Sequence, residues 1–123
     1  MSDPIRVFIV DDHDDVRRAL SARLSASPHV TLVGEAAEVE AALRQIQALR
    51  PDATLVESKR ADGRGLEVVS AIARNSGGTR VVVLTSYLNE WEEWAIHRAG
   101  AASYLLKGID TNQLIAQLRA TVT

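Results

Sequence analysis

Acidic, hydroxyl and basic side chains come directly after short apolar runs at four places in this sequence. Asp11 and Asp12 follow the first such run, Glu57 the third, Thr85 the fourth and Lys107 the fifth. Three carboxylates brought together repel one another, by roughly 4 kcal/mol for two unit charges at 4 Å and an effective dielectric constant of about 20. A cation is therefore required among them. Two candidates are a divalent ion such as Mg²⁺, which prefers oxygen ligands, and the ammonium group of Lys107.

The apolar runs that precede these side chains predict buried parallel strands. They are short, rich in β-branched residues and, in several cases, continuously apolar rather than alternating, which is typical of strands covered on both faces. We expect strands at residues 5–10, 30–33, 53–56, 81–84 and 104–106.

Longer segments with helical spacing of apolar residues lie between these runs. Apolar stripes that begin at Val16, Val39, Leu66 and Leu114 predict four helices, and a further helix is expected at Glu90–Arg98. Turn-forming segments at residues 50–52, 75–78 and 98–100 separate helices from the next strands. The order (βα)5 with right-handed crossovers predicts an α/β fold with three layers, in which helices cover both faces of a five-stranded parallel sheet. The polar residues at the strand ends then meet at one crevice, where such sheets bind ligands.

The composition indicates one ordinary globular domain. The chain has 123 residues, of which 46% are hydrophobic and 24% charged. A net charge of -2 provides no basic surface for nucleic acid or an anionic membrane, so contact with DNA would need a separate domain. The absence of cysteine excludes disulfides, thiolate metal sites and cysteine nucleophiles. No segment has the pattern of a signal peptide or a membrane span, and we expect a cytoplasmic location.

The residues at the strand ends and their spacing resemble the receiver domain of bacterial two-component response regulators. The resemblance rests on Asp11-Asp12, Pro51-Asp52, Leu84-Thr85-Ser86 and the segment Ala99–Gly108, which contains Lys107. It covers essentially the whole chain, so we expect one receiver domain over residues 1–123 and no DNA-binding domain. Residues 10–13 and 33–36 are most similar to receivers of transcription factors that carry a C-terminal helix-turn-helix domain of the LuxR/NarL type.

The resemblance implies a flavodoxin-like, CheY-like fold and a phosphorylation switch. In this family an Asp at the end of the third strand accepts a phosphoryl group from a histidine kinase. The resemblance assigns Asp11 and Asp12 to Mg²⁺, Thr85 to the mobile hydroxyl, Lys107 to the phosphate, and Tyr104 to the aromatic side chain that reorients on activation. Phosphoryl transfer depends mainly on positioning and charge neutralisation, which such residues supply.

Glu57 stands where the family carries the phosphoacceptor Asp, and Arg60-Ala61 replaces the usual Met-Pro that follows. The carboxylate of Glu reaches roughly 1 to 1.5 Å further than that of Asp, and displacements on this scale matter for attack geometry. Glu also mimics a phosphate only in part, since phosphate brings about -1.5 to -2 charges and three acceptor oxygens. We therefore expect an atypical receiver that is not an enzyme. It would work without phosphorylation, through protein contacts or as the regulatory domain of a transcription factor.

Lys59 and Arg60 place positive charge beside the acidic residues. Lys59 stands two residues past the acceptor position, where side chains of the family point toward the pocket. Its ammonium group could neutralise Asp12 and Glu57 in place of Mg²⁺. The sequence therefore leaves two forms of the site open, a metal-free pocket closed by salt bridges and a retained Mg²⁺ site. In a third interpretation, Lys59 and Arg60 extend into solvent.

Three aromatic residues and one histidine leave further alternatives. Trp91 and Trp94 share a face of the helix at 90–98, which in the family belongs to the output surface. They indicate either a partner or dimer interface or packing into the core. Tyr104 is either the switch aromatic or a static residue at the sheet edge. We interpret His13 as a residue at a helix start rather than as a metal ligand.

Two other functions compete with the atypical receiver. A phosphorylatable, Mg²⁺-dependent receiver would accept phosphate slowly on Glu57, or on Asp62 or Ser58 in its place. A phosphatase of the haloacid dehalogenase type is the remote alternative. The spacing Asp12-His13-Asp14 matches it, but the hydroxyl residue and later acidic motif that it needs are lacking. Expected partners are proteins, including a histidine kinase for the phosphorylatable form and a second copy in a homodimer, with no membrane.

Overall fold

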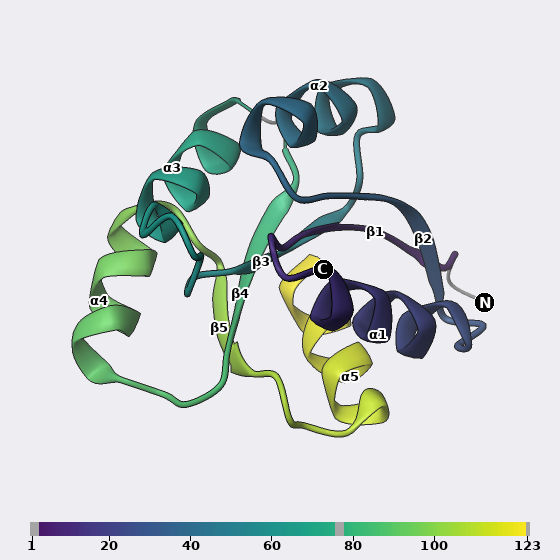
Figure 1. Ribbon diagram of the computed structural model, residues 1–123. Coiled ribbons are helices and arrows are strands. Elements are labelled where there is room, and N and C mark those ends of the chain that lie inside the picture. The colour runs from purple at the N-terminus through teal and green to yellow at the C-terminus, as the bar shows by residue number, and fades with distance from the viewer. Residues whose placement is uncertain (1–2, 76–77, 123) are drawn as a thin grey trace.

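The computed structural model describes residues 3–75 and 78–122, in which five strands alternate with five helices (Figure 1). The strands are β1 (Ile5–Val10), β2 (Val30–Ala36), β3 (Ala53–Glu57), β4 (Arg80–Thr85) and β5 (Ser103–Leu106). The helices are α1 (Asp14–Ser25), α2 (Val39–Leu49), α3 (Gly65–Asn75), α4 (Glu90–Arg98) and α5 (Thr111–Val122). The predicted (βα)5 order is confirmed. Part of the turn expected at 75–78, residues 76 and 77, lies outside the described residues.

All the strand pairs are parallel, and the strands lie in the order β2-β1-β3-β4-β5. The chain moves outward from β1 to β2 and then returns to the other side of β1 with β3. This reversal leaves a crevice beyond the carboxyl ends of β1 and β3, which is where open α/β sheets bind their ligands. The acidic residues at the ends of these two strands therefore lie at the crevice.

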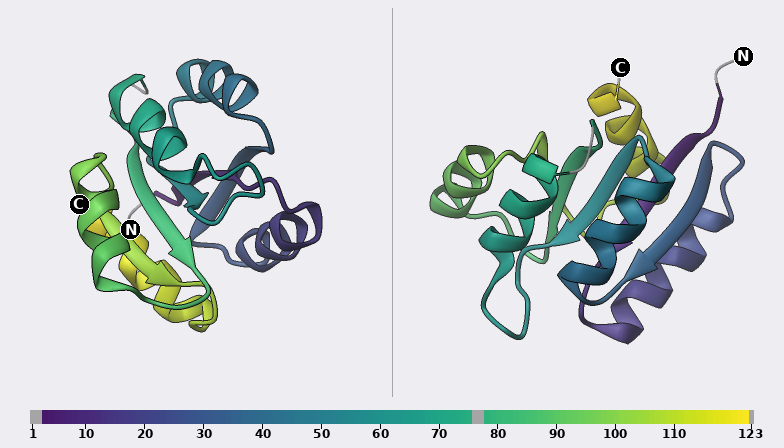
Figure 2. Two further views of the ribbon diagram at one scale, coloured as in Figure 1. Left: turned by 60° about the vertical axis from the view of Figure 1, so that its left-hand side comes forward. Right: turned by 90° about the horizontal axis from the view of Figure 1, so that it is seen from above.

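Helices cover both faces of the sheet, which confirms the predicted three layers (Figure 2). Helices α1 and α5 pack on one face, where they enclose Val7 and Ile9. Helices α2, α3 and α4 pack on the other, with Phe8 and Val10. Three members of the predicted apolar stripes stay exposed, namely Val16 by 38%, Leu66 by 40% and the small side chain of Ala19. No helix among the described residues has the length and apolar character needed to cross a bilayer.

Strand β2 is longer than its apolar run predicts. It continues past Val33 through Gly34 to Ala36 and pairs with β1 over its whole length, with a register shift between Val7 and Phe8. A Cβ at Gly34 would lie 2.8 Å from the ring of Phe8, so the glycine makes room for this core side chain. The extension brings the carbonyl of Ala36 within 3.1 Å of the backbone N of Asp11, where it accepts a hydrogen bond at the edge of the crevice.

Candidate functional site

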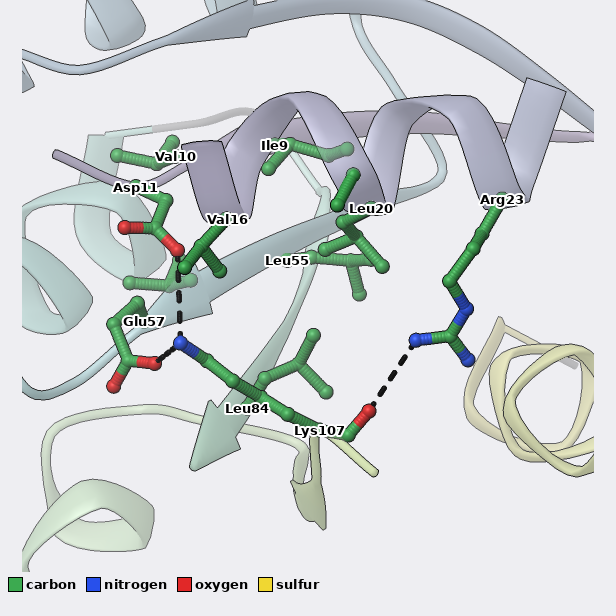
Figure 3. Close-up of a pocket in the computed structure, with 12 residues that line it drawn as sticks. Ile9, Val10, Asp11, Val16, Leu20, Arg23, Leu55, Glu57, Leu84 and Lys107 are labelled. Atoms are coloured by element: carbon green, nitrogen blue, oxygen red, sulfur yellow. Dashed lines mark hydrogen bonds and ion pairs between the residues drawn. The ribbon is translucent and has the colours of Figure 1, made fainter. Parts of the chain in front are cut away.

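Two buried carboxylates and one ammonium group meet at the crevice (Figure 3). Asp11 directly after β1 and Glu57 at the end of β3 are each 3% exposed, and they lie side by side because their strands are neighbours. Lys107 directly follows β5 and reaches past β4 to both acids. Its Nζ forms an ion pair with Oε2 of Glu57 and lies 3.8 Å from Oδ2 of Asp11. Lys107 is therefore one cation that the clustered acids require.

The loops that follow β1 and β3 hold the carboxylates through backbone N–H groups. The N–H of His13 donates to Oδ1 of Asp11 at 2.8 Å, and that of Lys59 donates to Oε1 of Glu57 at 2.7 Å. The N–H of Ala61 donates to Oδ2 of Asp12 at 2.9 Å, which joins the two loops. Each acid thus has one oxygen bound by the backbone and the other directed elsewhere.

His13 and Asp12 leave a site for positive charge beside this pair. His13 is the N-cap of α1, so its predicted place at a helix start is confirmed, whereas its side chain lies beside two carboxylates that could share a cation with it. Its Nδ1 lies 2.9 Å from Oδ1 of Asp11 and 3.1 Å from Oδ1 of Asp12. Oδ1 of Asp12 is buried and has no hydrogen-bond partner among the described residues, since the His13 contact is an ion pair only when the imidazole is protonated. One ligand atom from each of these three residues would fit around a single cation.

The prediction that Lys59 neutralises the pocket acids is wrong. The backbone of Lys59 is held by Glu57, and its side chain turns outward to Oε2 of Glu92 at 2.5 Å. Its Nζ also lies 5.1 Å from the centroid of the Tyr87 ring. The ammonium group therefore finds a carboxylate and an aromatic face outside the pocket, while Lys107 takes the place beside Glu57.

Arg60 does not join the pocket acids either. Its guanidinium group is buried, where Nη1 donates to the carbonyl of Ala37 at 3.0 Å and Nη2 lies 3.2 Å from Oδ2 of Asp62. Planar guanidinium groups favour such forked contacts with a carboxylate. Arg60 therefore fastens the loop after β3 to the loop after β2, and the interpretation of a solvated side chain is also wrong for this residue.

Glu92 connects Lys59 to Tyr104 and was missed by the sequence analysis. The hydroxyl of Tyr104, which is buried, donates to Oε1 of Glu92 at 2.5 Å. Burial raises the pKa of Tyr104, and the bond to Glu92 raises it further. Burial opposes ionisation of Glu92, but the hydrogen bonds from Lys59 and Tyr104 outweigh it and lower the pKa of this carboxyl. These contacts link the loop after β3, the first turn of α4 and β5.

The hydroxyls of Thr85 on β4 and Tyr104 on β5 are bonded to groups other than the pocket acids Asp11, Asp12 and Glu57. Thr85 is fully buried, and its hydroxyl donates to the carbonyl of Tyr87 at 2.9 Å. The hydroxyl of Tyr104 accepts a bond from the N–H of Asn89 at 3.2 Å in addition to its bond to Glu92. Both side chains are therefore hydrogen-bonded to the loop between β4 and α4 in this conformation.

Two arginines of α1 bind the backbone of the segments that carry Asp11 and Lys107, and the sequence analysis did not predict them. Arg17 donates to the carbonyl of Asp11 at 2.7 Å and to Oε1 of Glu35 at 2.9 Å. Burial alone would lower the pKa of Arg17, but its bonds to acids outweigh burial and raise it. Arg23 donates to the carbonyls of Lys107 at 3.3 Å and Ile109 at 2.8 Å, which fixes the loop that carries Lys107 (Figure 3). Spacing along the sequence gives no signal for contacts of this kind.

Trp91 and Trp94 are 68% and 59% exposed, so packing into the core is the wrong interpretation for both. The residues of α4 that face the core are Ala95 and Ile96. The predicted face shared by the two tryptophans does exist, but it points away from the sheet.

A small cavity lies beneath the charged groups, between α1 and strands β1, β3 and β4 (Figure 3). Its volume is about 190 Å³, and its walls are mostly apolar side chains such as Leu20, Leu55 and Leu84. Typical ligand pockets measure roughly 300 to 1,000 Å³. The cavity therefore has room for an ion or a group the size of phosphate, and lacks the room for a nucleotide.

The sequence model of the response regulator receiver domain matches residues 7–119. The DNA-binding transcriptional activator DevR/DosR of Mycobacterium tuberculosis is 36% identical over 110 residues, which cover 89% of this chain and 51% of that protein. The transcriptional regulatory protein LiaR of Bacillus subtilis is 34% identical over 116 residues, or 94% of this chain and 55% of that protein. The chain thus spans about half the length of these curated relatives.

Solved structures share the same architecture. The signal receiver domain of the response regulator NarL from Mycobacterium tuberculosis superposes with a TM-score of 0.86 at 28% sequence identity, covering 98% of both chains. A two-component response regulator of the LuxR family from Aurantimonas sp. SI85-9A1 gives a TM-score of 0.85 at 25% identity, over 97% of this chain and 85% of that one. These similarities extend over all the elements that carry the site residues.

Proposed function

Because this chain belongs to the response regulator receiver domain family, we propose that it is an atypical receiver in which Glu57 occupies the phosphoacceptor position and conventional phosphorylation is lost. The domain then regulates through protein contacts in a two-component type of pathway. The observation that carries this proposal is the ion pair of Glu57 with Lys107. Lys107, which the family resemblance assigns to the phosphate, is already paired with the carboxylate of Glu57.

The charges at the pocket support this proposal. A phosphoryl group would bring about -1.5 to -2 charges into a site that already holds Asp11, Asp12 and Glu57. Lys107 lies against two of these acids and cannot turn to a phosphate without leaving Glu57 unpaired. Glu57 is also the longer acid, so an attacking oxygen would lie roughly 1 Å away from the position that Asp provides.

The contacts of Thr85 and Tyr104, which the resemblance assigns to the switch, support the proposal that the domain is held in one conformation. The hydroxyl of Thr85 is bound to the carbonyl of Tyr87, and that of Tyr104 is bound to Glu92. Glu92 also accepts from Lys59, which is part of the loop directly after Glu57. This chain of contacts stabilises a fixed arrangement of α4 and β5 without a phosphoryl group.

The strand-end acids also fit a divalent cation. Asp11 and Asp12 would hold it, because Oδ1 of Asp12 is buried without a hydrogen-bond donor among the described residues and hard cations prefer carboxylate oxygens. A bound Mg²⁺ would neutralise carboxylate charge at the site. Lys107 pairs with Glu57 and Asp11 rather than with Asp12. The ion pair of Lys107 with Glu57 and a cation bound beside Asp12 are therefore compatible. Calorimetric titration with Mg²⁺ of the parent and of an Asp12→Asn variant measures this directly.

The deciding experiment compares the parent with Glu57→Asp and Glu57→Gln variants. Each protein is incubated with acetyl phosphate and Mg²⁺ and its intact mass is measured. We expect no mass gain for the parent or for Glu57→Gln, and a gain of one phosphate for Glu57→Asp. A phosphate on the parent that maps to Glu57 would instead establish the second candidate function, a slowly phosphorylatable receiver.

We also propose that this domain is the regulatory domain of a transcription factor. The support is that DevR/DosR is a DNA-binding transcriptional activator and that the chain spans only about half of such relatives. Contact with DNA would then come from a separate domain, and a histidine kinase would be a partner only if the pocket accepts phosphate. Expression of a reporter gene under a full-length regulator, compared between the parent and its Glu57→Asp variant, tests whether output depends on the acceptor position.

A further inference from the structure

The cavity between α1 and strands β1, β3 and β4 is enclosed mainly by core side chains (Figure 3). Its walls include Ile9 of β1, Leu55 of β3, Leu84 of β4 and Leu20 of α1. These four side chains are between 1% and 8% exposed and belong to one apolar cluster. Ligand sites in proteins are mostly apolar and largely formed before the ligand arrives. The cavity meets both conditions, because its walls are part of the packed core.

The cavity is open to solvent along one edge of α1. Val16 and Ala19 line it and are themselves exposed. The side chain of Lys107 lies opposite this helix, and two contacts of Lys107 frame the space (Figure 3). Its Nζ lies 3.8 Å from Oδ2 of Asp11, and its carbonyl accepts from Arg23 at 3.3 Å. A small molecule could therefore enter between α1 and Lys107 without unfolding any element.

The charged groups at the rim of the cavity already have protein partners. Glu57 pairs with Lys107, and Arg23 donates to backbone carbonyls. The buried side-chain atoms that lack a hydrogen-bond partner among the described residues are Oδ1 of Asp12 and Oγ of Ser58, and neither residue lines the cavity. A charged ligand would have to break an ion pair, and burial of an unpaired charge is far more costly than burial of apolar surface is favourable. The ligand that fits these walls is therefore uncharged.

The volume of the cavity, about 190 Å³, limits the size of this ligand. An apolar cavity of roughly 150 Å³ in a protein interior is large enough to bind benzene. The space beneath the charged groups therefore accommodates one aromatic ring, or a branched aliphatic group of similar size, with a short substituent. It is too small for a nucleotide or another drug-sized molecule.

We propose that this cavity is a binding site for an uncharged, apolar small molecule the size of one substituted aromatic ring. Burial of the ring against Leu20, Leu55 and Leu84 supplies the affinity. A ligand of about seven heavy atoms gains little free energy in total, so we expect a dissociation constant of about 0.1 to 1 mM. The site goes beyond the proposed function, because its walls are the same whether or not Glu57 accepts phosphate.

Titration with toluene, followed by NMR of the methyl groups, tests this site. We expect saturable shifts for the methyl groups of Leu20, Leu55 and Leu84, which line the cavity. Those of Ile72 should not move, because Ile72 packs on the opposite face of the sheet. Benzoate and benzylamine carry the same ring with a negative or a positive group. Each should bind at least about tenfold more weakly than toluene, since its charge would lie in an apolar space.

A variant that fills the opening locates the site. Ala19→Phe places a ring at the mouth of the cavity and should raise the dissociation constant of toluene at least about tenfold. Ala120→Phe is the matched control, because Ala120 is also an exposed helical alanine but does not line the cavity. It should leave the dissociation constant unchanged. Both substitutions are at exposed positions, and circular dichroism checks that each variant is folded.

Saturable shifts that Ala19→Phe abolishes and Ala120→Phe preserves would support the site. The absence of saturable shifts up to the solubility limit of toluene would overturn it. Equal binding to the parent and Ala19→Phe would place the ligand elsewhere and overturn it as well. Tighter binding of benzoate or benzylamine than of toluene would show that the rim charges, rather than the apolar walls, select the ligand. None of these outcomes bears on phosphate uptake, which is measured separately by mass.

Discussion

Replacing Lys107 by Met is expected to destabilise the fold by leaving two buried carboxylates without their cation. The side chains of Asp11 and Glu57 are 4% and 2% exposed, and that of Lys107 is 24% exposed. Removing one partner of a buried ion pair costs about 3 to 5 kcal/mol. The lower end applies because Lys107 is partly solvated and both acids keep a backbone hydrogen bond. We expect a loss of about 3 kcal/mol, or roughly 12 °C in Tm for a domain of this length.

Urea unfolding followed by far-ultraviolet circular dichroism measures this loss. Tryptophan fluorescence is a poor probe here because Trp91 and Trp94 are already exposed in the folded protein. The matched control is Lys59→Met, because the side chain of Lys59 is 42% exposed and its pair with Glu92 should contribute less than about 1 kcal/mol. The double variant Lys107→Met/Glu57→Gln removes the unpaired buried charge of Glu57 and should therefore recover part of the stability that Lys107→Met loses.

The stranded acids of Lys107→Met should also attract Mg²⁺. A ligand that binds only the folded state at 100 times its dissociation constant adds about 2.7 kcal/mol. We therefore expect Mg²⁺ to raise the Tm of Lys107→Met more than that of the parent. A Lys107→Met variant no less stable than Lys59→Met, or a double variant less stable than Lys107→Met alone, would refute the assignment of Lys107 as the cation that neutralises the pocket.

Two further predictions concern the loop after β3 and its contact with α4. Gly65→Ala should lose at least about 3 kcal/mol of stability or fail to fold, because its Cβ would lie 1.9 Å from the carbonyl oxygen of Ser58. Gly63→Ala is the control and should lose only about 1 to 2 kcal/mol, since Gly63 has a φ of +72° but open space around it. The pKa of Glu92 is lowered in the folded protein, so the ionised carboxylate stabilises the fold at pH values above the ordinary pKa of 4.5. This stabilisation is lost as the pH falls through the pKa of the folded state. Glu92→Gln should therefore lose less stability than the parent as the pH falls below 4.5 in urea titrations, and equal pH dependence of the two proteins would contradict this.

The sequence by itself determined the fold and the convergence of the site. Apolar runs of the type buried in parallel sheets alternate with helical spacing, and this order admits few topologies. Once the topology is given, residues at the carboxyl ends of the strands must lie at one edge of the sheet. Asp11, Glu57 and Lys107 are therefore brought together by the order of the elements, without any knowledge of side-chain contacts.

Tertiary structure alone decided which cation neutralises which acid. Lys59 is two residues from Glu57 in the sequence, whereas Lys107 is 50 residues away, yet Lys107 forms the ion pair. The local candidate fails because the backbone N–H of Lys59 binds Glu57, and its side chain is directed to Glu92. Such a choice depends on the path of a loop and on a carboxylate supplied by another helix, neither of which has a signature in sequence spacing.

The exposure of the tryptophans was also decided by the tertiary structure. The helical spacing of Trp91 and Trp94 predicts a shared face, but a short helix offers no sequence signal for which face meets the sheet when small residues such as Ala95 lie beside large ones. The direction in which α4 lies on α3 and β5 buries Ala95 and Ile96 and turns both indoles outward. Periodicity therefore determines which side chains lie together, and only packing determines whether they face the core or a partner.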